Sequence, residues 1–74
     1  MSAVSTNDFL KGLMERVTRQ NARILLDSAL VQAGITFGSE LNQEQAKNLC
    51  LQLIKQGGPA FHVGQTMYRR TQVQ

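Results

Sequence analysis

The clearest pattern in the sequence is an apolar stripe at helical spacing, which predicts an amphipathic helix over residues 42–56. The stripe consists of Ala46, Leu49, Cys50, Leu53 and Ile54. Asn42 is a good N-cap, and the Gln45 side chain can complete a capping box with the Asn42 backbone. Gly57 can adopt the left-handed conformation that closes a helix, and Pro59 forbids its continuation.

A longer apolar pattern spans residues 8–33, but its apolar side changes direction part-way. The first side consists of Leu10, Leu13, Met14 and Val17, and the second of Ala22, Leu25, Leu26, Ala29, Leu30 and Ala33. At about 100° per residue the two sides differ by roughly 140°, and the segment 18–21 between them is polar. No proline marks a break, so the sequence favours one long helix that ends at Gly34. The alternative is a break near residues 18–21, which would give three helices in all.

Beyond Pro59 the pattern changes from helical to alternating, which predicts a β-hairpin over about residues 60–70. The strand residues and the turn between them are, in order, Phe61, Val63, Gly64, Gln65, Thr66 and Tyr68. A Gly-X pair is typical of the type II′ turn that joins paired strands. The alternative is an irregular tail that touches the core only through Phe61.

These elements predict a mainly α fold with a small β element: an antiparallel helical pair followed by a C-terminal β-hairpin. The 74 residues suffice for one domain, expected over residues 7–74 after a frayed segment 1–6. A chain this short buries only about 60% of its unfolded surface. With one cysteine and one histidine, the sequence offers no disulfide framework and no metal cluster to compensate. Self-association is the remaining common solution, so we expect a homodimer.

The second half of the segment 8–33 is apolar over most of its circumference, as in helices that are buried on several sides. In so small a chain, a partner subunit is the expected source of that burial. The residues expected at this interface are Leu25, Leu26, Ala29, Leu30 and Ala33.

The sequence carries no sign of a membrane or secretory location. No apolar run approaches the length of a membrane span, and residues 1–6 lack the charged and apolar regions of a signal peptide. Cys50 belongs to an apolar stripe and is expected to be a buried thiol in a reducing compartment. We therefore expect a cytoplasmic protein without a membrane partner.

Residues that could carry catalysis are few and scattered. His62 is the only histidine, with no carboxylate or nucleophile within a few residues. The carboxylates are spread along the chain as Asp8, Glu15, Asp27, Glu40 and Glu44. We therefore expect no enzymatic activity, no catalytic residue, no metal site and no cofactor.

The charge pattern permits an anionic partner, because the net charge is +3. A basic stripe on the long helix and a basic end of the β-hairpin consist of Arg16, Arg19, Arg23, Arg69 and Arg70. Such side chains can hold a phosphate backbone. Glu15 and Asp27 would neutralise part of the stripe through i,i+4 pairs.

Residues 53–70 contain a lysine–glycine helix end, a proline–aromatic segment, a valine–glycine turn and two arginines. This run resembles the helix end and wing of excisionase-type winged-helix proteins. The positions that the resemblance places against DNA are Lys55, His62, Arg69 and Arg70. The chain departs from that family just before the run, where one uninterrupted helix is expected in place of a tight helix-turn-helix.

Two functions are consistent with this pattern. The first is a small non-enzymatic regulatory or adaptor protein that acts through protein–protein interaction as a homo-oligomer, with an unidentified protein partner. The second is a small DNA-binding protein that uses the basic hairpin and the arginine stripe. One long dimerising helix would favour the first function, and three helices with a wing would favour the second.

Overall fold

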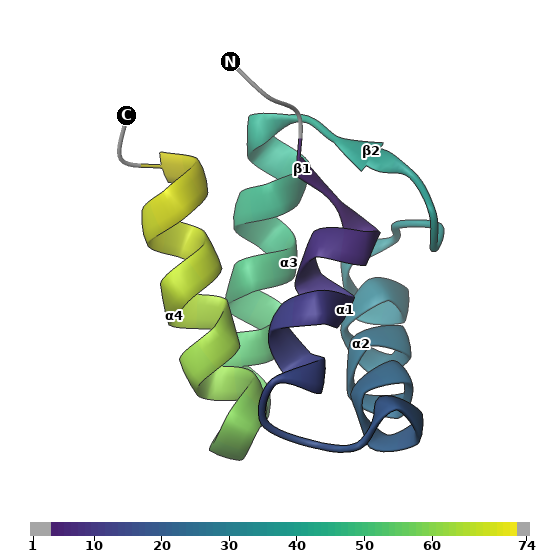
Figure 1. The fold of residues 1–74 in the computed structure, drawn as a ribbon. Coiled ribbons are helices and arrows are strands. Elements are labelled where there is room, and N and C mark those ends of the chain that lie inside the picture. The colour runs from purple at the N-terminus through teal and green to yellow at the C-terminus, as the bar shows by residue number, and fades with distance from the viewer. Residues whose placement is uncertain (1–3, 73–74) are drawn as a thin grey trace.

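The structure is a computed structural model that describes residues 4–72 (Figure 1). Its elements are β1 (Val4–Ser5), α1 (Thr6–Met14), α2 (Arg19–Ala33), β2 (Glu40–Leu41), α3 (Gln43–Gln56) and α4 (Gly58–Gln72). The predicted mainly α fold with a small β element is confirmed. The predicted position of that β element is wrong, because β1 and β2 lie near the start and the middle of the chain.

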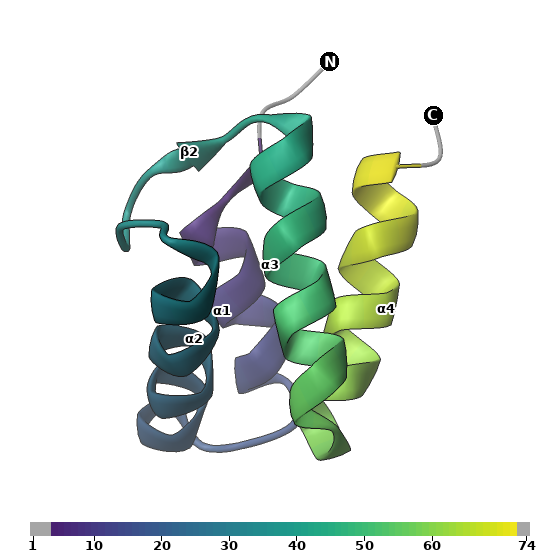
Figure 2. The ribbon, with the colours of Figure 1, turned by 180° about the vertical axis from the view of Figure 1, so that it is seen from behind.

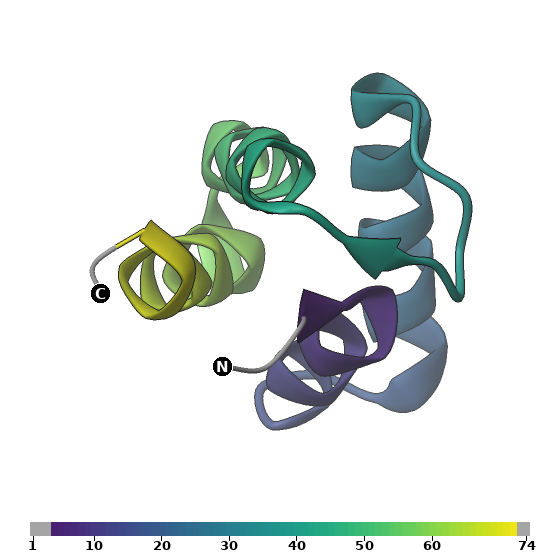
Figure 3. The same cartoon turned by 90° about the horizontal axis from the view of Figure 1, so that it is seen from above.

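The helices run alternately down and up in the view of Figure 1, and the two strands lie near one end of them (Figures 1 and 2). α1 packs against α2 and α4, and α3 packs against the same two helices. α3 and α4 lie side by side, and α2 lies on the opposite edge of the molecule, inclined to them (Figure 3). This leaves one side of the α3–α4 pair and one side of α2 without a helical neighbour among residues 4–72.

The two strands fasten the start of the chain to the connection between α2 and α3. They are antiparallel, with Val4 opposite Leu41 and Ser5 opposite Glu40. The buried Thr6 hydroxyl accepts a hydrogen bond of 2.6 Å from the Gly38 backbone N–H. Residues 4–6 are therefore held in place instead of frayed, and residues 1–3 of the predicted frayed segment lie outside the described residues.

The prediction of one long helix over residues 8–33 is wrong, and the alternative break is found slightly earlier, between Met14 and Arg19. The Thr18 hydroxyl caps α2 by accepting a hydrogen bond of 3.3 Å from the Asn21 N–H. The break has a physical reason, because apolar sides about 140° apart cannot both face one core from a straight helix. After the break, Leu13 of α1 and Leu26 of α2 are both fully buried in the same core.

The predicted C-terminal end of α2 and the predicted start of α3 are confirmed in detail, whereas Gly57 after α3 (φ 78°, ψ −173°) is not in the left-handed helical conformation. Gly34 is left-handed (φ 70°), and the Ile35 N–H donates to the Leu30 carbonyl at 3.0 Å. At the start of α3, the Asn42 and Gln45 side chains each accept a hydrogen bond from the backbone N–H of the other, at 2.8 and 3.0 Å.

The predicted β-hairpin over residues 60–70 is wrong, because this segment lies within α4. The buried residues of α4 are Ala60, Val63, Gly64 and Met67, a stripe at helical spacing. Pro59 stands in the first turn, where a missing N–H costs no helical hydrogen bond. The resemblance to a winged-helix wing fails for the same reason, since residues 60–70 contain no strand.

Gly64 is a contact point between helices and not a turn residue. A β-carbon at this position would lie 2.8 Å from the Cys50 carbonyl oxygen and 3.1 Å from the Ile54 backbone nitrogen. Glycine therefore lets α4 approach the backbone of α3 more closely than any other residue would allow.

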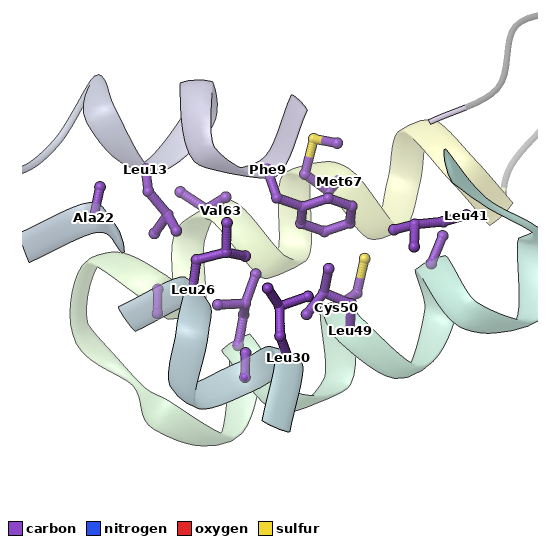
Figure 4. Packing of buried hydrophobic residues seen from close by; sticks show 14 residues of the cluster. Phe9, Leu13, Ala22, Leu26, Leu30, Leu41, Leu49, Cys50, Val63 and Met67 are labelled. Atoms are coloured by element: carbon purple, nitrogen blue, oxygen red, sulfur yellow. The ribbon is translucent and has the colours of Figure 1, made fainter. Parts of the chain in front are cut away.

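The buried core lies between all four described helices, with Phe9 of α1 extending toward Met67 and Cys50 (Figure 4). Three residues that were predicted at a dimer interface belong to this core: Leu26, Ala29 and Leu30. They are at most 3% exposed, so a partner subunit cannot reach them. Leu25 and Ala33 are half-buried. The predicted interface is thus wrong for its central residues, because folding of the chain itself covers them.

Candidate functional site

The charges of the chain are unevenly distributed over the fold. α3 and α4 contain the cations Lys47, Lys55, Arg69 and Arg70 and the single carboxylate Glu44. The remainder of the chain has four cations and four carboxylates. The entire net charge of +3 therefore belongs to the α3–α4 pair.

One flank of the α3–α4 pair faces away from α1 and α2, and we call it the outer face. It consists of the residues that directly follow a buried position along each helix and are not themselves buried: Lys47, Leu51, Ile54, Phe61, Gln65 and Tyr68. The opposite flank is occupied, since Gln56 donates a hydrogen bond of 3.0 Å to the Leu25 carbonyl of α2. Val63 and Met67 likewise lie toward α1. Because α3 and α4 are antiparallel, matching flanks of the two helices meet on the same side.

The outer face combines apolar side chains with a cationic edge. Leu51 is 40% exposed, and Ile54, Phe61 and Tyr68 are half-buried. The exposed side chains that border the outer face are Lys55 on α3 and His62 and Arg69 on α4. The rings of Phe61 and His62 meet edge to face with centroids 5.6 Å apart. This surface can bind a ligand that offers apolar groups in its centre and negative charge at its margins.

Three of the residues predicted to contact nucleic acid, Lys55, His62 and Arg69, are exposed and border the outer face, Lys55 on α3 and the other two on α4. Arg70 lies on the opposite flank of α4, where it lines a groove between α1 and α4 together with Arg16. The predicted arginine stripe does not form, because Arg16 lies in the break between α1 and α2.

Arg23 is used within the fold. Its Nε donates to the Asp27 carboxylate at 2.9 Å, which confirms the expected i,i+4 pair, and its guanidinium stacks 3.8 Å above the Phe37 ring. The expected i,i+4 pair between Glu15 and Arg19 is not formed. α1 ends before Glu15 and α2 starts at Arg19, so the two residues are not on one helix.

The groove between α1 and α4 has a volume of about 270 Å³. Arg16 and Arg70 share its walls with the carboxylates Asp8 and Glu15. The Asp8 carboxylate already accepts a hydrogen bond of 3.0 Å from the Ser5 N–H, as part of the cap of α1. With both signs of charge along its walls, the groove selects less clearly for one kind of ligand than the outer face does.

The side chains that could carry catalysis lie apart. Cys50 is fully buried, and burial raises the pKa of its thiol from 9.0 to about 11, so it is protonated at neutral pH. His62 is exposed on the outer edge of α4. Within residues 4–72, no group of three or more His, Cys, Asp or Glu side chains could hold a metal ion. None of the helices in this range is both long and apolar enough to cross a membrane.

The raised pKa of Cys50 predicts a loss of stability at alkaline pH. Between pH 9.0 and about 11 the unfolded chain loses the thiol proton while the folded chain keeps it, so the free energy of unfolding falls as the pH rises. The expected loss is roughly 2–3 kcal/mol at about 1.4 kcal/mol per pKa unit. The measurement is urea unfolding of the wild type and of Cys50→Ala at about pH 8 and about pH 11. An equal loss in both proteins would contradict the assignment to Cys50.

The outer face was missed by sequence analysis because its definition depends on α4 being a helix. Leu51 and Tyr68 are separated by a turn in the sequence, and nothing local indicates that they share a surface. Comparison of the chain with protein-family models, with curated proteins and with solved structures found no significant match.

Proposed function

We propose that the chain is a small non-enzymatic adaptor that acts as a homo-oligomer and binds a partner protein through the outer face of the α3–α4 pair. One observation supports this most directly. The outer face, which is bordered or lined by three of the four cations of the α3–α4 pair, also exposes Leu51 beside three half-buried apolar side chains.

The chemistry of the outer face favours an acidic amphipathic helix as the bound segment. Two antiparallel helices form a shallow groove in which a third helix can lie, with apolar side chains at its i, i+3, i+4 and i+7 positions. Contact with Leu51 and Tyr68 would supply most of the affinity, as buried apolar groups do at protein interfaces. Carboxylates of the partner would face Lys47, Lys55 and Arg69, which would mainly direct orientation and association rate.

Nucleic-acid binding is the alternative, and the structure offers it less support. The sequence-based criterion for it was a helix break together with a wing; the break exists, but α4 occupies the place of the wing. The arginine stripe is also absent, and Glu44 adds a negative charge to α3. Nucleic-acid-binding domains usually show a denser basic surface.

The test is a titration of the protein with a fluorescent helical peptide of about four turns, apolar along one side and rich in Asp and Glu elsewhere. We expect saturable binding that weakens at least tenfold in Leu51→Asp, which corresponds to about 1.4 kcal/mol. Met14→Asp is the matched control, because Met14 is 41% exposed against 40% for Leu51 and lies on α1. Its binding should equal that of the wild type.

Two further ligands make the test decisive. A peptide with the same residues in scrambled order should bind at least tenfold more weakly, because its apolar side is lost. Duplex DNA should bind more weakly than the acidic peptide at about 0.15 M salt. Tight DNA binding that falls steeply with salt and is lost in Arg69→Ala would instead support the nucleic-acid alternative. Equal losses in Leu51→Asp and Met14→Asp would overturn the assignment of the outer face.

A further inference from the structure

The side of α2 that faces away from the core has an apolar line of its own. Ile24 is 61% exposed and Val31 is 76% exposed, more than the other large apolar side chains that are exposed in residues 4–72. They are seven residues apart, so they lie on the same side of α2, two turns and about 10 Å apart. Ser28, small and exposed, stands between them.

We propose that this line, Ile24, Ser28 and Val31, is the contact through which two copies of the chain associate. The proposal deepens the homo-oligomer part of the proposed function. It also replaces the interface predicted from the sequence, whose central residues are inside the core.

The lack of net charge on this surface favours a second copy of the chain as its partner. A two-fold symmetric interface brings identical patches together, so a patch with net charge repels itself. The outer face, with Lys47, Lys55 and Arg69, is of that kind. The α2 line is flanked by the uncharged residues Gln20, Asn21 and Gln32. One charged pair, Arg23 and Asp27, lies at its edge. That pair is neutralised within each copy by its 2.9 Å contact.

The shape of the line suits helix-to-helix contact. Ser28 has the smallest side chain of the three, so two α2 helices can approach to the 8–10 Å that is usual between packed helices. Ser28 lies near the midpoint between Ile24 and Val31, so the copies bring their Ser28 residues together whether the helices run parallel or antiparallel. Because α2 and α4 lie at opposite edges of the fold (Figure 3), the contact leaves both outer faces open. The dimer would therefore present two binding surfaces and gain avidity for a repeated partner.

The size of the contact predicts that the dimer is weak and reversible. α2 has 15 residues, which corresponds to a length of about 22 Å. A contact along one such helix buries less than the roughly 800 Å² per partner of a standard interface. Since each copy has its own core, folding does not depend on the dimer. We expect a dissociation constant between about 10 μM and 1 mM.

The test combines disulfide capture with a measurement of mass. Under mild oxidation at equal concentration, Ser28→Cys should form a covalent dimer at least tenfold faster than the control Asn48→Cys, an exposed position on α3. The native Cys50 is buried and protonated, so it does not compete. Adding Val31→Asp to Ser28→Cys should reduce the rate to that of the control. In sedimentation equilibrium, the wild-type mass should rise above 8.2 kDa with concentration, and that of Val31→Asp should not.

Equal rates for Ser28→Cys and Asn48→Cys, or a constant monomer mass up to about 1 mM, would overturn the inference. The outcome is separable from the adaptor function. Val31→Asp should bind the acidic peptide with the wild-type constant per chain, because the outer face lies on other helices. Loss of peptide binding with intact self-association would reject the partner surface alone, and the reverse would reject the α2 contact alone.

Discussion

Replacing Phe9 with alanine is expected to lower the free energy of unfolding by about 3–5 kcal/mol, the usual cost of deleting a buried aromatic ring. Phe9 is 0% exposed and is the only aromatic residue among the buried hydrophobic residues of the described chain. It extends from α1 into the space between the helices, toward Met67 of α4 and Cys50 of α3 (Figure 4). Its removal therefore weakens the packing of α1 against both. The measurement is urea unfolding followed by circular dichroism.

Leu51→Ala provides the matched control for the Phe9 experiment, since it also removes apolar atoms from a helix but at a position that is 40% exposed. Its expected effect is below about 1 kcal/mol, because surface substitutions leave no cavity. If Phe9→Ala cost no more than Leu51→Ala, the ring could not occupy the centre of the core. A domain of 74 residues has little stability to spare, so Phe9→Ala is also expected to populate the unfolded state at 37 °C.

The features predicted correctly from the sequence are those set by neighbouring residues. The cap of α3 depends on Asn42 and Gln45, which are three residues apart. The end of α2 depends on Gly34, the residue directly after the helix. Such hydrogen bonds and backbone conformations need no knowledge of the rest of the chain, because the groups that satisfy them are adjacent in sequence.

The position of the break between α1 and α2 could not be predicted from local hydrogen bonds and backbone conformations. No proline or glycine lies between Met14 and Arg19, and the Thr18 cap is weaker evidence than an uninterrupted run of helix-forming residues. The deciding interaction is tertiary. Leu13 and Leu26 reach one core only when the chain turns between them, and their burial outweighs the hydrogen bonds lost in the break.

Only the charged residues beside the candidate site were predicted from the sequence, and the resemblance that led to them was wrong. Lys55, His62 and Arg69 were grouped by a resemblance to a β-hairpin wing, and they are exposed beside the outer face, but on two separate helices. The sequence shows that Ile24 and Val31 are apolar, but their exposure could be known only after Leu26 and Leu30 had been placed in the core. Which residues form a surface depends on which residues pack in the core, and the hydrophobic pattern of the sequence did not determine that packing.

The segment 60–70 shows that ambiguity most clearly. Val63 fits both an alternating pattern with Phe61 and a helical stripe with Ala60 and Met67. Gly64 fits both a tight turn and a close contact between helices. A short apolar run does not by itself distinguish strand from helix. Packing against α3 selects the helix here, because the apolar stripe of α3 is covered by the buried stripe of α4.

Replacing Gly64 with alanine is expected to lower the free energy of unfolding by about 2 kcal/mol or more, although alanine favours a helix over glycine by about 1 kcal/mol. The added β-carbon would lie 2.8 Å from the Cys50 carbonyl oxygen and 3.1 Å from the Ile54 nitrogen. Both are backbone atoms, so the overlap can be relieved only by moving α3 and α4 apart. Such a movement loosens the contacts of Met67 and Val63 as well. Urea unfolding of the variant measures the loss.

Gly12→Ala is the control that separates crowding from helix propensity. Its added β-carbon would lie 3.2 Å from Cγ1 of Val63, a side-chain atom that can shift by a few tenths of an ångström. The gain in helix propensity from glycine to alanine is then offset by little steric overlap. The free energy of unfolding should therefore stay within about 1 kcal/mol of wild type or rise. Equal effects of the two substitutions would contradict the close approach of α3 and α4. A stable Gly12→Ala beside an unstable Gly64→Ala would show that the identity of residue 64 is set by the neighbouring helix.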